Sequence, residues 1–114
     1  MERSTPIAVN FYKTESGNEP TREWLSSLKK DYTKAIGEDV KTVQFGWPLG
    51  MPLVKKIEPN LWEVRTKLKD GFARIIFTMV DEKIIIVHGF MKKSNKMPKS
   101  DLELARKRMK MVRG

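Results

Sequence analysis

The chain has 114 residues, of which 39% are hydrophobic and 32% charged, and this composition suits one globular domain spanning residues 1–114. It contains no cysteine and one histidine, which excludes disulfides, thiolate chemistry and Cys- or His-rich metal sites, so we expect no cofactor or metal. The first ten residues, MERSTPIAVN, have no apolar signal segment, and no stretch approaches the roughly 18 apolar residues of a membrane span. We therefore expect a cytoplasmic protein without a membrane partner.

The net charge of +9 is unevenly distributed along the chain. Between residues 83 and 114 there are ten Lys or Arg residues against two Asp or Glu residues. Nucleic acid is the usual partner of so basic a segment. A solvated basic helix, or a helix that docks on an acidic protein, would also explain it.

The first half of the chain predicts one strand and two helices. Residues 6–12 (PIAVNFY) alternate as a strand does, and Pro20 stands where helices begin. A short amphipathic helix follows, and a second helix runs from about residue 31. The segment 45–52 (FGWPLGMP) is typical of a loop.

The second half predicts three strands and a helix. The strands are 61–68, 72–80 and 83–91, and Asp70-Gly71 is a hairpin turn signal between the first two. Ser100 and Glu103 match a capping box at the start of the last helix. The predicted fold class is α+β: an N-terminal strand and two helices, then a three-stranded antiparallel meander joined to the first strand in one sheet, then a C-terminal helix. The helices are expected to cover one face of the sheet.

The hairpin register predicts a charged surface on the other face. With the turn at residues 70 and 71, Lys67 lies directly opposite Arg74, and both point away from the core together with Glu63 and Arg65. Like charges directly opposite each other are normally avoided, so a bound phosphate would explain the pair. An ordinary solvated sheet face is the alternative.

The same register, continued through the next turn, concerns the only histidine. It places Gly89 opposite Arg74, where the glycine would leave open space beside the guanidinium group. It places His88 on the core face, so we interpret His88 as a structural histidine beneath the C-terminal helix, with a catalytic role as the alternative.

Several stretches of this second half resemble a known toxin family. They are PLVKKIEPNLWEVR, FARIIF and IIIVHGFMKKSNKMP, followed by a helix ending in ARKRM. They are similar to the HigB-like branch of the RelE/ParE toxin superfamily, a group that includes phage-derived host-killing proteins. The likeness covers roughly residues 50 to 112.

The resemblance implies a RelE-like fold and the toxin of a type II toxin–antitoxin system. Such a toxin is an mRNA interferase: a metal-independent endoribonuclease that cuts mRNA on the ribosome and inhibits translation. A cognate antitoxin of the helix-turn-helix type would neutralise it and provide the main oligomeric contact. The residues expected to carry cleavage are Arg65, Arg74, Lys93 and Glu63, and those expected to bind RNA are Lys67, Lys92, Lys96, Lys55 and Lys56.

The residue chemistry is compatible with this activity and leaves the proton donor open. Arginine binds phosphate oxygens through two parallel hydrogen bonds, which suits Arg65 and Arg74 to the extra charge of a transition state. Glu63 is a candidate general base, with Lys67 or Lys93 as the rival. A basic nucleic-acid-binding module that does not cut is the alternative, and we expect no exposed aromatic side chain on the charged surface for it to use.

Overall fold

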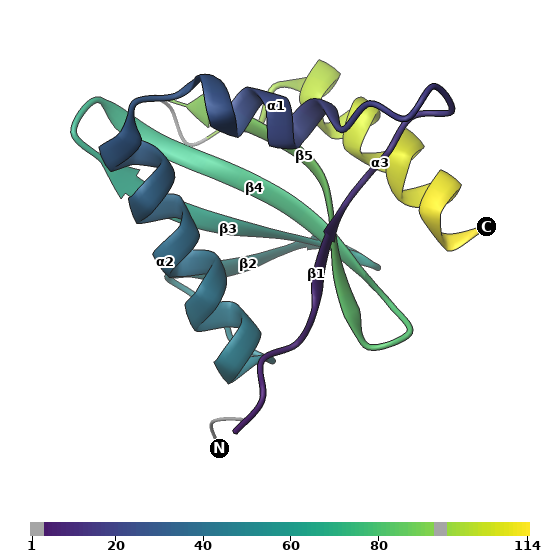
Figure 1. The fold of residues 1–114 in the computed structure, drawn as a ribbon, viewed down its shortest axis with the longest axis horizontal. Helices are drawn as coiled ribbons and strands as arrows, with labels where there is room; N and C mark the ends of the chain where they lie inside the picture. The colour runs from purple at the N-terminus through teal and green to yellow at the C-terminus, as the bar shows by residue number, and fades with distance from the viewer. Residues whose placement is uncertain (1–3, 93–95) are drawn as a thin grey trace.

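The computed structural model of the protein describes residues 4–92 and 96–114, which form three helices and five strands (Figure 1). All the expected elements are present, and the structure adds β2, for which the sequence predicts no element. In chain order the elements are β1 (Val9–Phe11), α1 (Pro20–Ser27), α2 (Lys30–Gly46), β2 (Val54–Glu58), β3 (Leu61–Leu68), β4 (Gly71–Val80), β5 (Lys83–Lys92) and α3 (Lys99–Arg113).

The five strands form one mixed sheet in the order β1-β5-β4-β3-β2. β1 runs parallel to β5, and the other neighbours are antiparallel. The α+β class and the joining of the first strand to the meander are therefore confirmed. β2 and β3 meet at a tight turn where Asn60 has a φ of 68°, a left-handed conformation that asparagine tolerates better than most residues.

The helices divide between the two faces of the sheet, and the prediction that they share one face is wrong. Ile36 and Val43 of α2 belong to the same apolar cluster as Ile75 of β4. Ala105 of α3 belongs to a second cluster with Ile76, the next residue of β4. Successive strand residues point to opposite faces, so α2 and α3 lie on opposite sides of the sheet. Figure 1 shows them apart, α2 at the left and α3 at the right.

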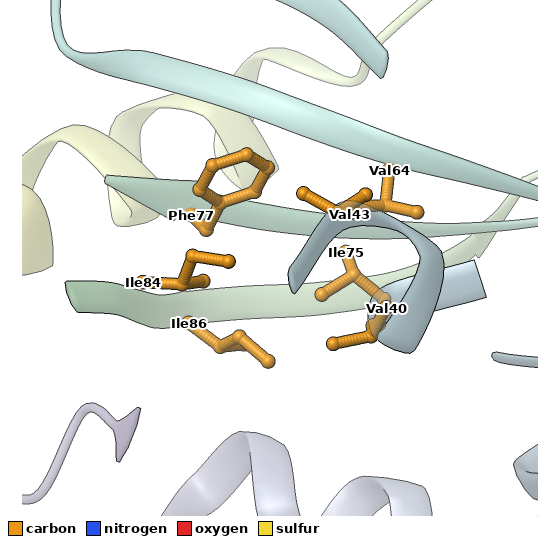
Figure 2. A pocket seen from close by; sticks show the side chains of 7 residues that line it. All are labelled: Val40, Val43, Val64, Ile75, Phe77, Ile84 and Ile86. Carbon is orange, nitrogen blue, oxygen red and sulfur yellow. The ribbon is translucent and has the colours of Figure 1, made fainter. Parts of the chain in front are cut away.

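The face toward α2 carries a closely packed apolar core. Figure 2 shows Val40 and Val43 of α2 against side chains of β3, β4 and β5. The gap between them leaves no room for a water molecule, so it is a packing gap of the core rather than a ligand site. The strand residues that line it are Val64, Ile75, Phe77, Ile84 and Ile86.

The β3–β4 hairpin is shifted by two residues from the expected register. Leu68 pairs with Gly71, so the turn residues are 69 and 70, and Arg74 lies opposite Arg65 instead of Lys67. Gly71 has a φ of 143°, which favours glycine, and the Tyr32 hydroxyl of α2 donates a 2.5 Å hydrogen bond to Asp70 in the turn. A shift of two residues keeps every side chain on its face, so the predicted division between core and charged residues holds on β3 and β4.

A β-bulge between β4 and β5 changes faces and overturns the expectations for Gly89 and His88. Phe77 pairs with Ile86, but Ile76 pairs with His88, which leaves one extra residue in β5. His88 therefore shares a face with Ile76, and Gly89 lies opposite Ile75. A Cβ on Gly89 would come within 2.7 Å of the Trp24 ring, so the glycine admits α1 to the sheet and leaves no space beside Arg74.

The N-cap of the last helix lies two residues before the one that the capping box predicted. This N-cap is Pro98, with no side-chain capping hydrogen bond, so Ser100 lies inside the first turn. The apolar stripe is as expected, with Ala105 and Met109 buried and Leu102 and Val112 packed beside them.

Candidate functional site

Three rows of side chains cross the sheet on the face toward α3, beyond the part where α3 packs. Ile76 packs toward α3, and Glu63 lies directly opposite it, so Glu63 is on the same face. Every second residue of a strand shares a face, so residues 65 and 67 of β3 are on it too. Directly opposite residues share a face, so their partners on β2, β4 and β5 belong to the same surface, which we call the charged face. Row by row it consists of Lys55 opposite Glu63, then Arg65 opposite Arg74, which in turn lies opposite Phe90, and then Lys67 opposite Phe72, which in turn lies opposite Lys92.

A buried ion pair lies at the centre of the charged face. Arg74 Nη1 donates a 2.7 Å hydrogen bond to Glu63 Oε1, and Arg65 Nε lies 4.0 Å from the same oxygen. Glu63 is 3% exposed and Arg74 2%, so both are buried although they lie on the predicted face, and at these two positions the alternative of an ordinary solvated face is wrong. The carboxylate between the two guanidinium groups explains how two arginines tolerate positions directly opposite each other, and no phosphate is needed to balance them.

The ion pair leaves hydrogen-bonding capacity unused. Glu63 Oε2, Arg74 Nε and Arg65 Nε are buried, and none of them has a hydrogen-bond partner among residues 4–92 and 96–114. Buried polar atoms are seldom left in this state, because each lost hydrogen bond to water costs free energy. The cluster is therefore an energetically expensive element of the fold.

Lys92 adds a further buried cation to the charged face. Lys92 as a whole is 6% exposed. Burial lowers the pKa of Lys92 below its ordinary value of 10.5, and the positive charges of Arg74, Lys55 and Arg65 lower it further, while Glu63 raises it. The amine of Lys92 therefore loses its proton more readily than that of a solvated lysine.

The accessible part of the charged face lies around Arg65. The Arg65 side chain is 20% exposed, and its Nη1 meets the Met51 thioether, a weak acceptor, at 3.9 Å. Lys55 and Lys67 are exposed on either side of it. Phe72 is partly exposed on the same face, with the Arg65 and Arg74 guanidinium carbons 5.8 and 5.6 Å from its ring centre, so the expectation of no accessible aromatic side chain there is wrong.

The remaining predicted residues lie elsewhere or outside the described residues. Lys56 pairs with Trp62, whose ring packs with the core toward α2, so Lys56 is on the opposite face. Lys96 is exposed in the connection before α3. Lys93 lies outside the residues that the structure describes.

His88 connects the sheet to α3. Its Nε2 lies 2.7 Å from Asp101 Oδ1 in the first turn of α3, and its ring stacks on Phe90 at 5.6 Å between centres. The interpretation of His88 as a histidine with a structural partner under α3 agrees with these contacts, although the face expected for it was wrong. The expected face was wrong because of the bulge in β5, and no residue pattern in β5 predicts that bulge.

The described part of the chain has neither a cluster of metal ligands nor a membrane-spanning helix. Within residues 4–92 and 96–114, no three His, Asp or Glu side chains gather as metal ligands would. None of the helices that the structure describes is both long enough and apolar enough to cross a membrane.

The protein is similar to known proteins in both fold and sequence. The structure matches a chain from the crystal structure of the toxin–antitoxin complex RelBE2 of Mycobacterium tuberculosis, with a TM-score of 0.52 over 82% of this chain and 100% of that chain. The two sequences are 16% identical, so the match establishes a shared RelE-like fold. No curated protein sequence matches the chain. The family model described as phage derived protein Gp49-like (DUF891) matches residues 23–110, which is most of the chain. The chain therefore belongs to the Gp49-like family of phage-derived proteins.

Proposed function

We propose that this protein is the HigB-like toxin of a type II toxin–antitoxin system and cuts mRNA on the ribosome in the cytoplasm. The main support for the proposal is the charged face, where the accessible Arg65 is surrounded by four other cations and one carboxylate. These residues come from four strands and are Lys55, Lys67, Arg74, Lys92 and Glu63. The shared fold with a chain of a toxin–antitoxin complex supports the toxin assignment. The net charge of +9 suits a polyanionic substrate.

The proposed reaction is cleavage of RNA by its own 2′-hydroxyl. The 2′-oxygen attacks the adjacent phosphorus, the bond from phosphorus to the 5′-oxygen breaks, and the products are a 2′,3′-cyclic phosphate and a 5′-hydroxyl. One proton leaves the 2′-hydroxyl for a base, and one is delivered to the departing 5′-oxygen by an acid. The extra negative charge of the transition state requires cations fixed in position.

Arg65 is the proposed contact with the scissile phosphate. It is the accessible arginine of the charged face, and Lys55 and Lys67 beside it can hold the flanking phosphates. Glu63 and Arg74 are buried, so we assign them the positioning of Arg65 rather than direct contact with RNA. A guanidinium group held in advance by fixed neighbours spends no energy on reorganisation during the reaction.

The proton transfers are assigned to lysines. Lys92 is buried like Glu63 and Arg74, but unlike them it makes no ion pair within the described residues, so its amine remains available to the substrate. Its lowered pKa increases the fraction of neutral amine at a given pH, which is the form that can accept the 2′-hydroxyl proton. Lys93, its neighbour in the sequence, is the proposed donor of the proton to the 5′-oxygen. Such a site is weak without precise substrate placement, so the ribosome is the proposed agent that orients the RNA.

A basic module that binds nucleic acid without cutting it is the second candidate. Phe72 favours it, because single-strand binders place aromatic rings beside cationic side chains to stack bases. The two candidates differ in one outcome: only the nuclease produces new 5′-hydroxyl ends in ribosome-bound mRNA.

Controlled expression in a bacterium tests the toxin proposal. Inducing the wild-type chain is expected to arrest growth and protein synthesis, and mapping of mRNA 5′ ends is expected to show new cuts within translated codons. Co-expression of the protein encoded next to it, the proposed antitoxin, is expected to restore growth. Normal growth with soluble wild-type protein accumulating in the cell would contradict the proposal.

A further inference from the structure

An open depression lies at the edge of the charged face where the sheet narrows. β2 begins at Val54 opposite Val64, and beyond that point the Arg65 amide donates a hydrogen bond to the Leu53 carbonyl. The described residues include no strand beside the last part of β3 on this side. The depression formed there has a volume of about 440 Å³ and is lined by Asp39, Pro52, Leu53, Arg65, Lys67 and Phe72.

The lining combines apolar side chains with cations. Phe72, Leu53 and Pro52 supply the apolar surface, and Arg65 and Lys67 supply positive charge. The Arg65 and Arg74 guanidinium carbons lie over the Phe72 ring, 5.8 and 5.6 Å from its centre. Nucleobases stack on aromatic rings and on guanidinium planes, while the cations neutralise the phosphates.

Asp39 of α2 is the unexpected member of this lining. It is a half-buried carboxylate facing the same depression as Arg65 and Lys67, yet within residues 4–92 and 96–114 its side chain makes no ion pair or hydrogen bond. A carboxylate near two cations that it does not contact remains available to accept hydrogen bonds from a ligand.

We propose that this depression is a nucleobase subsite that favours guanine. Guanine offers its N1–H and N2–H₂ donors to the Asp39 carboxylate, its O6 and N7 acceptors to Lys67 or Arg65, and its ring to Phe72. Uracil presents two carbonyl oxygens around a single donor, so a carboxylate disfavours it. This inference rests on the proposed function, because the bound base belongs to the RNA whose phosphate binds Arg65. The subsite would give the protein a preference for RNA with guanine at that position.

Binding of nucleoside monophosphates to the purified protein tests the subsite without any need for cleavage. Dissociation constants for GMP, AMP, CMP and UMP are measured by NMR titration for the wild type, Phe72→Leu and Asp39→Asn. Phe45→Leu and Asp31→Asn are the matched controls, since both change the same residue types on α2 outside the depression. Circular dichroism checks the folding of each variant.

The wild type is expected to bind GMP at least fivefold more tightly than UMP. Phe72→Leu keeps an apolar side chain but loses the aromatic face, and we expect it to weaken all four ligands by about 5- to 10-fold, the lower end of what one stacked base contributes. Asp39→Asn is expected to remove the preference for GMP over UMP while leaving UMP binding close to that of wild type. The controls should match the wild type.

Three outcomes would overturn the proposal. The first is equal binding of GMP and UMP by the wild type, and the second is unchanged GMP binding in a folded Phe72→Leu protein. The third is a Phe72→Leu protein that loses only its affinity for the antitoxin, because this result would assign the depression to a protein partner. A wild type that prefers GMP but never cuts mRNA would refute the nuclease function and leave the subsite standing.

Discussion

The two faces of the sheet are built on different physical principles. Toward α1 and α2, side chains such as Ile75 and Phe77 are fully buried in an apolar cluster. Toward α3, part of the sheet is apolar, and the adjoining part buries Glu63, Arg74 and Lys92. A buried ion pair is often no more stabilising than apolar residues of the same volume, because both ions lose their hydration. We therefore expect the first face to be the main source of stability, and the proposed function is our explanation for the charge buried in the second.

The largest expected effect on stability comes from breaking the apolar face. Phe77 is fully buried, with the Trp47 ring 5.4 Å away edge-on and the Trp62 ring stacked at 5.8 Å. Phe77→Ala removes these contacts and leaves a cavity, so we expect a loss of about 3–5 kcal/mol in the free energy of unfolding. Urea denaturation measures it, with Phe77→Leu as the milder control. A loss below about 1 kcal/mol would show that this face is not the main source of stability.

Breaking the ion pair on the charged face comes next. Arg74→Ala leaves the Glu63 carboxylate buried without its 2.7 Å partner, and we expect a cost of about 3 kcal/mol, since Lys92 compensates part of the charge. The double variant Glu63→Leu with Arg74→Met buries no charge at these positions and should recover most of that loss, yet cut mRNA poorly because Arg65 is no longer positioned. Denaturation and cleavage are measured on the same preparations. A double variant that is no more stable than Arg74→Ala would refute the view that this pair contributes little net stability.

The smallest expected effect concerns Lys92 and depends on pH. Because its pKa in the folded protein is below 10.5, the unfolded chain binds more protons between the two pKa values, and stability rises with pH across that window. The penalty of burying the cation is fully present below the window and absent above 10.5. Lys92→Met should therefore be slightly more stable than the wild type at pH 7, and the difference should shrink as the pH approaches 10.5. Thermal unfolding at several pH values measures it, and a difference independent of pH would contradict the assignment.

How far the sequence predicts this fold depends on side-chain parity. The register error at the β3–β4 turn was two residues, so Glu63, Arg65 and Arg74 stayed on the predicted common face. The bulge in β5 shifted the pairing by one residue, and this moved His88 to the other face. The alternation of apolar and polar residues therefore predicts which side chains of a strand share a face. A bulge moves the residues after it to the other face, and the sequence does not show where it occurs.

The burial of the site was beyond the sequence analysis for a different reason. A row of charges on an outer strand face suggests exposure, but Arg74 is 2% exposed because Glu63 pairs with it and neighbouring elements enclose the pair. The periodicity of α3 identified its apolar stripe but not the face of the sheet on which that stripe packs. The missed strand β2 had a usable signal in Pro59-Asn60, a turn dipeptide before residue 61.

RNA is proposed to be cut at the accessible part of the charged face, and two arginine variants test this most directly. Arg65→Ala removes the proposed phosphate contact, and Arg22→Ala removes an exposed arginine of α1 that pairs with Glu19 away from this face. In cleavage of ribosome-bound mRNA by purified proteins, Arg65→Ala is expected to lose about 10²- to 10³-fold in rate. Arg22→Ala should stay within about twofold of the wild type, since an exposed ion pair contributes little. A folded Arg65→Ala protein that cuts at the wild-type rate, or equal losses in both variants, would contradict the central claim.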